Sequence, residues 1–381
     1  MNRRAQHSTD QSNDSVDSEV ARDIQAAWQS LAATDLEQLV PSAVLQRSLT
    51  VRSVVSTTSS FATRSQRLKN ATTQNYQEIG RGLQGIVYER IGSISVTKKE
   101  LPTNPGRRLS IEFAMHRTVW DAFGKYAQQC NDVRVPKPHE FIPGDSLSLE
   151  LLSRMPEGDR RPGNIVTMER ILPLPKVVRK AMIQEFYPNK NTVSDERMVT
   201  RLLSEPANKY CLARVYLGKE SMTMSEGRFT LQNFPLTLDL MDKLGLDMER
   251  FAKMIGSAYA IMHWAAHNTG DDVEFVLGTS TSADRDFQKR EIHMYLLDFG
   301  QCDTVDMSED QDDIFQAFKG AMVLQPNQLY LPHPRRSPSL YQAWKSAYRS
   351  TAREVIRCEG LPFNPEEFLE EYEEYLEDFY P

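Results

Sequence analysis

The chain has 381 residues, of which 40% are hydrophobic and 25% charged, so it is long enough for one two-lobed domain or two ordinary ones. Its formal net charge is −7 and it has no dense Lys/Arg block, which disfavours a nucleic-acid partner. No apolar stretch reaches the ~20 residues of a membrane helix and no signal peptide is visible, so we expect no membrane partner and a cytoplasmic or nuclear location.

The N-terminal segment, residues 1–70, is rich in Ser, Thr and Gln. Such a composition buries too little apolar surface to offset the entropy of ordering a backbone, which predicts a mostly disordered arm. The exception is 18–33, where a short amphipathic helix is expected. Its apolar residues recur at helical spacing, namely Val20, Ile24, Trp28 and Leu31.

Residues 74–171 change to short β-like runs broken by glycine, which predict a small antiparallel sheet. A helix is expected at about 108–127, followed by a buried strand at 164–169 that ends before a Pro-rich turn. The first three strands of this sheet are expected at 76–80, 85–91 and 93–98.

Residues 172–238 look like an insertion, in which two β-like runs, Cys211–Leu217 and Arg228–Asn233, could close a β-hairpin. The remainder, 239–381, is predicted to be mainly helical, with a strong helix at 247–266. An acidic C-terminal helix should begin at Pro365, because Asn364 and Glu367 form a capping box around it; these residues stand in the sequence FNPEEF.

The sequence GRGLQGIV at 80–87 fits the pattern G-x-G-x-x-G-x-V. In a nucleotide-binding loop, glycines let the backbone turn tightly over phosphates and point its N–H groups at them. Gly80, Gly82, Gly85 and Val87 are therefore candidate nucleotide-binding residues. An ordinary hairpin with flexible glycines fits equally, whereas a dinucleotide fingerprint is disfavoured because the next segment is another strand.

Eleven residues after Val87 comes Lys98, where a kinase-like lysine would contact the α and β phosphates. Glu112, on the expected helix, would hold that lysine in place, and the neighbouring Lys99 is a rival for the role. After the strand at 164–169, the backbone groups of Glu169 and Ile171 would face an adenine edge, although a plain core strand explains them as well.

The tripeptide Asp298-Phe299-Gly300 follows the apolar run Met294–Leu297. Its aspartate could hold Mg²⁺ that bridges the phosphates of ATP. Glycine loop, lysine, hinge and DFG tripeptide occur in the same order, each on the expected type of element. Together they predict an α+β, two-lobed, divergent protein-kinase-like fold, with an N-lobe built on the antiparallel sheet and a mainly helical C-lobe.

The chain thus resembles the protein-kinase-like superfamily over about 74–381. In detail, the phrases IMHW, DDVEFVLG and LLDFGQC are similar to an uncharacterised fungal family whose members are often labelled zinc-finger-protein-like. The sequence gives that label no support, because the four cysteines are far apart and no zinc-ligand spacing is present. We therefore expect free thiols and no zinc.

The catalytic loop is where the pattern fails. A kinase reads H-R-D-x-x-x-x-N, whereas the best register here is His267-Asn268-Thr269, with Glu274 at the asparagine position. Threonine cannot accept a proton at neutral pH. Glu274 could still bind a cation, and Asp271 or Asp272 could replace the missing base if the loop is rebuilt.

The segment after Gly300 is short and has no Ala-Pro-Glu anchor, which makes a peptide-substrate groove doubtful. The sequence therefore favours a catalytically degenerate pseudokinase that binds ATP and Mg²⁺ or regulates a protein partner. The alternative is a small-molecule phosphotransferase of the aminoglycoside-phosphotransferase kind that uses Mg-ATP.

Overall fold

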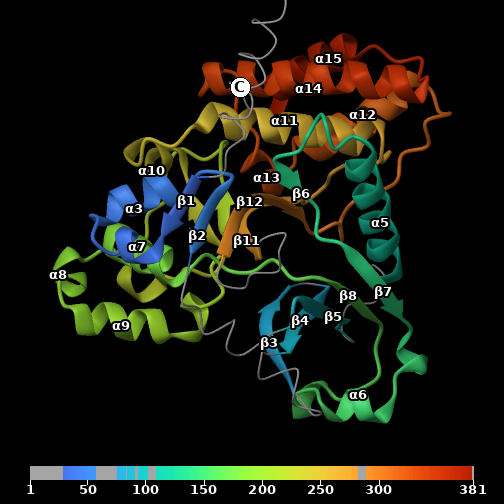
Figure 1. Cartoon of the computed structure of the whole chain (residues 1–381). Helices are drawn as coiled ribbons and strands as arrows, with labels where there is room; N and C mark the ends of the chain where they lie inside the picture. The colour runs from blue at the N-terminus through green and yellow to red at the C-terminus, as the bar shows by residue number, and fades with distance from the viewer. Residues whose placement is uncertain are drawn as a thin grey trace, which may run out of the picture.

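The computed structural model describes residues 29–56, 75–82, 84–90, 93–101, 109–281 and 289–379. Within them the chain is α+β, with two β-sheets and a set of long helices (Figure 1). No helix in this part of the chain combines the length and the apolar character needed to cross a lipid bilayer.

One sheet is antiparallel and has five strands in the order β3-β4-β5-β8-β7. The strands are β3 (Tyr76–Arg81), β4 (Gly85–Arg90), β5 (Ser95–Glu100), β7 (Pro138–Ile142) and β8 (Ile165–Glu169). Helix α5 (Leu109–Lys125) packs against β7 and β8. Four of these strands and the helix lie where the sequence places them, while β7 was not expected.

The other sheet is mixed and has seven strands, in the order β1-β2-β12-β11-β9-β10 with β6 also paired to β12. The strands are β1 (Gln29–Ala32), β2 (Ser53–Ser56), β6 (Val133–Arg134), β9 (Ala213–Val215), β10 (Phe234–Leu236), β11 (Glu274–Thr281) and β12 (Lys289–Leu297). The antiparallel pair β11–β12 forms its centre. Both strands lie in the part of the chain predicted to be mainly helical, at the runs VEFVL and HMYLLDFG, which indicate a strand, a loop and a second strand.

The expectation of a disordered arm is wrong for residues 29–56. This segment forms β1, α2 (Ala33–Leu36), α3 (Pro41–Ser48) and β2, and β2 pairs with β12. Val44, Leu45 and Val55 are buried in the main core, where α3 packs on α7 (Lys176–Phe186). The prediction used the composition of the whole segment 1–70, in which the Ser/Thr-rich flanks outweigh this short apolar stretch. The helix expected at 18–33 lies outside the described residues up to position 28, and 29–32 are a strand.

The expected β-hairpin in 172–238 is also wrong. Strands β9 and β10 pair in parallel, so a tight turn cannot connect them. The second predicted run is not a strand: residues 229–233 form irregular backbone and a turn, and β10 begins only at Phe234. Strand β9 pairs on its other side with β11, and this brings the insertion into the larger sheet.

The remaining helices surround the two sheets (Figure 1). They are α6 (Leu149–Ser153), α7, α8 (Lys190–Val193), α9 (Glu196–Ser204), α10 (Leu238–Lys243), α11 (Met248–Trp264), α12 (Gln311–Met322), α13 (Gln325–Gln328), α14 (Pro338–Glu359) and α15 (Pro365–Phe379). The main core lies where α11, α14 and α15 meet, around fully buried aromatic side chains such as Trp264, Trp344 and Tyr348.

Helices α11 and α14 pack closely against each other at Gly256. A Cβ atom there would lie 2.4 Å from the backbone oxygen of Trp344, so Gly256→Ala should force the helices apart. We expect it to lower the free energy of unfolding by about 1–3 kcal/mol in urea denaturation. The control Gly124→Ala, in α5, meets nothing within 4 Å and should be neutral or stabilising. Equal effects of the two changes would contradict the close packing at Gly256.

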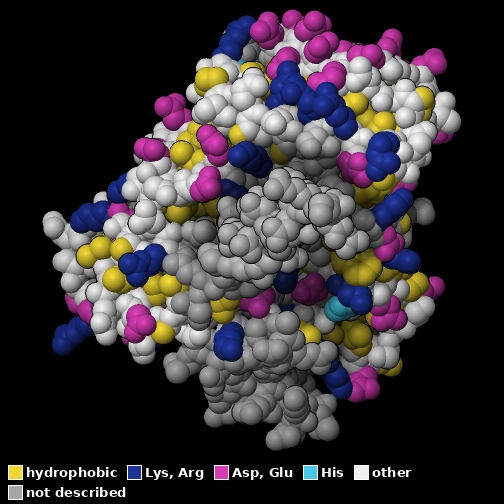
Figure 2. All heavy atoms as spheres, turned by 45° about the horizontal axis from the view of Figure 1, so that its top comes forward, with side chains coloured by type: hydrophobic (Ala, Val, Ile, Leu, Met, Phe, Trp, Pro, Cys, Tyr) yellow, Lys and Arg dark blue, Asp and Glu magenta, His cyan; other side chains and the backbone are white. Residues whose placement is uncertain are grey.

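Helix α15 begins as its capping pattern predicts, since Asn364 Oδ1 accepts a hydrogen bond from the Glu366 N–H at 3.1 Å. Its apolar face is buried, whereas its glutamates reach basic residues on neighbouring helices, for example Glu371 to Lys319 at 2.6 Å. In Figure 2 acidic side chains gather along the upper rim, the end at which Figure 1 draws α14 and α15. The acidic surface is thus partly neutralised by ion pairs.

Candidate functional site

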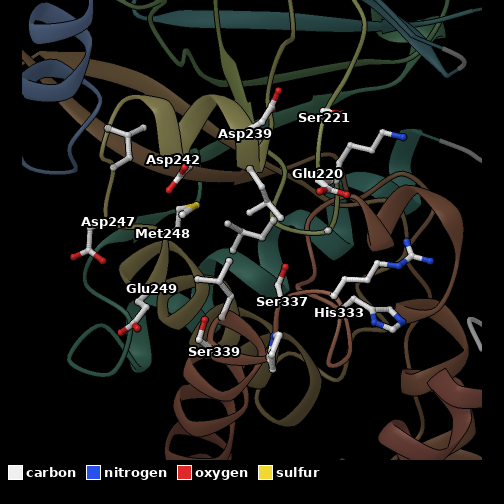
Figure 3. A pocket seen from close by; sticks show the side chains of 18 residues that line it. Glu220, Ser221, Asp239, Asp242, Asp247, Met248, Glu249, His333, Ser337 and Ser339 are labelled. Carbon is white, nitrogen blue, oxygen red and sulfur yellow. The ribbon is translucent and has the colours of Figure 1, made fainter.

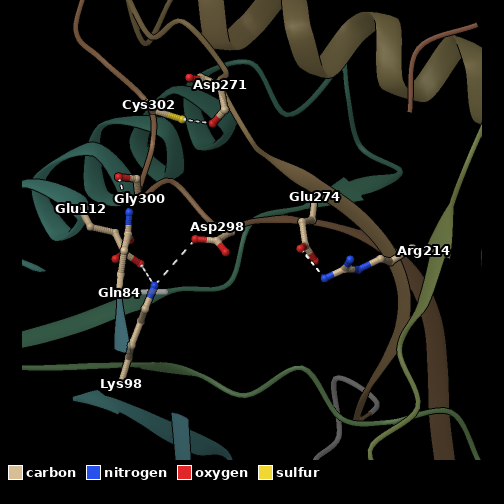
Figure 4. A network of polar contacts seen from close by, with 9 residues as sticks. All are labelled: Gln84, Lys98, Glu112, Arg214, Asp271, Glu274, Asp298, Gly300 and Cys302. Carbon is tan, nitrogen blue, oxygen red and sulfur yellow. Dashed lines mark hydrogen bonds and ion pairs between the residues drawn. The ribbon is translucent and has the colours of Figure 1, made fainter. Parts of the chain in front are cut away.

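Lys98 lies on β5, the middle strand of the antiparallel sheet, between Val87 on β4 and Val166 on β8. Its Nζ lies 2.6 Å from Glu112 Oε1 on α5 and 3.7 Å from Asp298 Oδ1 (Figure 4). Burial alone would lower the pKa of Lys98, but the two carboxylates raise it above its ordinary value. The structure therefore brings together Lys98, Glu112 and Asp298, the three charged residues that the sequence proposes for a nucleotide site, with a protonated lysine at their centre. These three residues are called the Lys98 group below.

The rival lysine faces elsewhere. Lys99 Nζ donates to the backbone oxygen of Asp159 at 2.9 Å, beyond the other face of the sheet. Successive residues of a strand point to opposite faces, so the two lysines cannot share one site. Of the two lysines, Lys98 is the one that contacts Glu112 and Asp298, so it stays the candidate for phosphate contact.

Asp298 follows β12 and has a φ of +68°, in the left-handed region that non-glycine residues seldom adopt. This backbone turns its side chain toward Lys98 and leaves it 43% exposed. The next residue, Phe299, is buried and packs against the His116 ring of α5, with ring centroids 5.0 Å apart. The tripeptide thus joins α5 to the end of β12.

The glycine loop differs from the expectation in one respect. The N–H of Gly82 donates to the Gly85 carbonyl at 2.9 Å, so it closes a turn and does not point at a ligand. Gly85 is needed for close packing, because a Cβ there would lie 2.7 Å from the Lys99 oxygen. Gly80 and Val87 pair across β3 and β4. The β3–β4 segment therefore behaves largely as a hairpin.

This loop contacts the tripeptide through a residue that the sequence did not single out. Gln84 Nε2 donates to the Gly300 oxygen at 2.7 Å (Figure 4). A Cβ at Gly300 would lie 1.7 Å from Gln84 Oε1, so only glycine fits at that position with Gln84 in this place. A polar residue inside the glycine pattern was the available signal.

The proposed hinge residues lie at the junction of the two sheets. The Glu169 N–H donates to the Lys137 oxygen at 2.8 Å, and the Ile171 side chain lies against Gly278 of β11. Leu172 then bridges to Thr279 of the larger sheet. Among the described residues, no polar contact joins Glu169 or Ile171 to the Lys98 group, so their part in binding stays a prediction.

The loop after α11 holds Thr269 where a kinase would have its catalytic aspartate. Thr269 is buried, its N–H donates to the Asp303 oxygen at 3.0 Å, and its Oγ1 accepts from the Asp303 N–H at 3.0 Å. The Thr269 hydroxyl is therefore hydrogen-bonded to the backbone of the segment after Gly300. It holds the loop in place and offers no base.

The two aspartates proposed as substitutes for that base differ in position. Figure 4 shows the Asp271 side chain pointing away from Asp298, while its backbone oxygen accepts a contact from Cys302 Sγ at 3.3 Å. For Asp272, burial raises the pKa, and the nearby carboxylate of Asp298 raises it further. Asp272 therefore interacts electrostatically with Asp298.

Glu274, the proposed metal ligand, forms an ion pair with Arg214 of β9 (Figure 4). Burial raises the pKa of Glu274 to about 7, an effect that Arg214 opposes and Asp298 adds to. Arg214 could not be identified from local sequence patterns, because it stands 60 residues before Glu274 in a segment whose pairing was predicted wrongly. A cation at Glu274 would have to compete with this guanidinium.

No family model and no curated protein matches the chain. A microcompartment-associated aminopropanol kinase is similar among solved structures, with 11% identity over 82% of this chain and 98% of that chain. The TM-score of the pair is 0.21, which is too low to support an argument about fold or activity.

A separate cavity of about 1120 Å³ opens at the N-terminal end of α11, among α10, α14 and the segment after β9 (Figure 3). Its lining includes five carboxylates, from Glu220, Asp239, Asp242, Asp247 and Glu249. Asp247 caps α11 by accepting from the Arg250 N–H at 2.9 Å. The loop of Thr269 follows the opposite end of this helix, about 25 Å away at 1.5 Å per residue. Neither Lys98, Glu112 nor Asp298 lines the cavity, which is therefore distinct from the Lys98 group.

The charged residues around Lys98 fit a magnesium ion only in part. Mg²⁺ in nucleotide sites is held by one or two carboxylates plus the phosphates of the ligand. Asp298 fits, being accessible and next to Lys98, whereas Glu274 does not fit while Arg214 holds it. The described residues contain no group of three His, Cys, Asp or Glu side chains suited to a metal, and the four cysteines are free thiols.

Proposed function

We propose that the chain is a divergent kinase-like protein that binds a nucleotide in the cleft beside Lys98 without transferring its phosphate, and that it acts as a regulatory or interaction protein. The observation that carries this proposal is the contact of Lys98 with both Glu112 and Asp298. A lysine fixed by a helix glutamate and an aspartate that could hold a metal is the arrangement with which kinases position phosphates.

The surrounding elements support a two-lobed kinase-like fold. The five-stranded antiparallel sheet with α5 corresponds to the smaller lobe, and the segment after β8 leads, as a hinge would, into the part that contains α11 and β12. If Mg-ATP binds here, Lys98 would contact its phosphates and Asp298 would hold the Mg²⁺, which would neutralise phosphate charge. Glycines of the β3–β4 hairpin would cover them.

Thr269 argues against phosphotransfer. A general base must lie within hydrogen-bond reach of the proton that it abstracts, and the Thr269 hydroxyl has no basicity and is occupied by Asp303. In this proposal the protein works through a protein partner in the cytoplasm or nucleus. Residues 1–70 and the insertion 172–238 are the segments proposed to bind that partner.

Asp272 supports a second candidate, a small-molecule phosphotransferase that uses Mg-ATP. Its carboxylate interacts with Asp298, and its raised pKa brings it nearer to the range of a general base. Steady ATP consumption by the wild type that is abolished by Asp272→Asn, with nucleotide binding retained, would favour this enzyme over the non-catalytic protein.

Nucleotide binding should be visible as stabilisation of the full chain. At a ligand concentration of 100 times the Kd, ATP with Mg²⁺ should add about 2.7 kcal/mol to the free energy of unfolding, measured by urea denaturation and as a rise in Tm. Lys98→Met should remove most of this gain, because the charged contact to phosphate is lost.

Lys99→Met is the matched control, since this adjacent lysine contacts Asp159 on the opposite side of the sheet. It should keep the nucleotide-dependent gain. Absence of any gain in the wild type would refute nucleotide binding. An equal loss in both variants would show that the Lys98 effect is only structural.

A further inference from the structure

The ion pair between Arg214 and Glu274 is built by strand pairing. Strand β9 lies antiparallel to β11 with Arg214 opposite Val276, and Glu274 is two residues from Val276 on the same face of β11. The two side chains are 24% and 18% exposed, so the pair is largely buried but still reaches solvent. Two strands fix its position, and no flexible loop is involved.

Arg214 places a permanent positive charge there. Burial alone would lower its pKa, but the Glu274 carboxylate raises it above the ordinary value. A second contact, from Nη1 to the Tyr216 hydroxyl at 3.5 Å, holds the side chain beside Glu274. A guanidinium also suits phosphate oxygens, to which it can donate two parallel hydrogen bonds.

The pair belongs to the same electrostatic group as Lys98. Glu274 interacts with Asp298, and Asp298 lies 3.7 Å from Lys98. Figure 4 draws Asp298 between the Lys98–Glu112 pair and the Glu274–Arg214 pair. This row of charged side chains thus has a fixed cation at each end, Lys98 and Arg214, with the carboxylates of Asp298 and Glu274 between them.

We propose that the Arg214 guanidinium takes the place of a divalent cation at Glu274 and, together with Lys98, binds the phosphates of the ligand, so that the site accepts no more than one divalent cation, at Asp298. The inference rests on the proposed nucleotide binding. It assigns a phosphate-binding role to an insertion residue that contributes no chemistry in the general kinase pattern.

The number of metal ions gives the first test. With saturating ATP, the wild-type chain should bind no more than one Mn²⁺ ion per nucleotide, counted by the loss of the free-Mn²⁺ electron paramagnetic resonance signal. Arg214→Gln should bind one additional Mn²⁺, because it frees the Glu274 carboxylate. Two Mn²⁺ ions per nucleotide in the wild type, or no gain in Arg214→Gln, would overturn the proposal.

Binding of inorganic tripolyphosphate in the presence of EDTA gives a second test, which requires neither a nucleobase nor a metal ion. A hydrogen bond to a charged group contributes about 1.5–3 kcal/mol, so Arg214→Gln should weaken its binding about tenfold or more by isothermal titration calorimetry. Arg214→Lys should restore part of the affinity. An unchanged affinity in Arg214→Gln would overturn the phosphate-binding role.

The matched control is Arg250→Gln, which removes the ion pair of another half-buried arginine. In the wild type, Arg250 Nη2 lies 2.9 Å from Asp132 Oδ2. It should bind Mn²⁺ and tripolyphosphate as the wild type does. If Arg214→Gln fails to fold, the double change Arg214→Met with Glu274→Leu leaves no buried charge unpaired. That variant should lose tripolyphosphate affinity without gaining Mn²⁺, and wild-type affinity in it would refute the role.

The tests also separate this inference from the proposed function. Binding of tripolyphosphate without binding of ATP, with the loss in Arg214→Gln, would support the role of Arg214 and refute the nucleotide site. Binding of ATP that is insensitive to Arg214→Gln would do the reverse. Binding of neither anion would refute both.

Discussion

Glu89→Met is expected to lower the free energy of unfolding by about 3–5 kcal/mol, the usual cost of leaving a buried charge without its partner. Glu89 on β4 forms an ion pair with Arg170, just after β8, and both side chains are less than one-tenth exposed. Glu89 Oε1 also accepts from the Tyr210 hydroxyl at 2.8 Å. Its loss would leave the guanidinium surrounded by low-dielectric protein.

Urea denaturation measures this effect, and Glu78→Met is the control in the same sheet. Glu78 pairs with Arg81 at 2.8 Å, but both side chains are well exposed, so that change should cost only about 0–1 kcal/mol. Adding Arg170→Met to Glu89→Met should recover much of the loss. A cost below about 1 kcal/mol for Glu89→Met would mean that water reaches this pair.

Acid should destabilise the protein strongly between pH 6.5 and pH 4, because two histidines are buried in neutral form. Burial lowers the pKa of His116 to about 4 and that of His263 to about 3, from an unfolded value near 6.5. Since the unfolded chain binds more protons in this window, stability is complete above pH 6.5 and falls as the pH drops toward the folded pKa. Each pKa unit of difference between the folded and unfolded chain corresponds to about 1.4 kcal/mol. His116 alone should therefore account for a loss of roughly 3 kcal/mol in the free energy of unfolding.

The measurement is urea denaturation at several pH values between 7.5 and 4. His116→Gln should flatten the curve relative to the wild type, because it removes a buried neutral imidazole. Identical pH dependence in His116→Gln and the wild type would contradict the buried neutral state. Because His116 packs on Phe299, its protonation should also loosen the tripeptide that carries Asp298.

The parts of the fold and site that follow local rules could be predicted from sequence. Alternation and glycine breaks located β3, β4 and β5, and helical periodicity located α5. Lys98 and Glu112 meet because one lies on the central strand and the other on the helix packed beside that sheet. Asp298 joins them because it ends a buried strand.

The parts that depend on distant pairing could not be predicted. Residues 29–56 order because β2 finds an edge of β12, more than 200 residues away, and no local pattern records that partner. The parallel pairing of β9 with β10 is likewise non-local. Arg214 was missed for the same reason, since its ion pair with Glu274 depends on the pairing of β9 with β11. For Thr269 the sequence showed a lost aspartate, but not the backbone that its hydroxyl binds.

The pairing of β2 with Lys289–Glu291 of β12 determines where the protein can be shortened. A chain that starts at residue 75 would keep the five-stranded sheet and the long helices, yet it would leave that stretch of β12 with open backbone donors and acceptors. It would also uncover the apolar surface on which Leu45 and Leu49 lie. An open strand beside an apolar face is a template for aggregation, so insolubility of such a fragment would reflect the missing strand and not a defect of the domain itself.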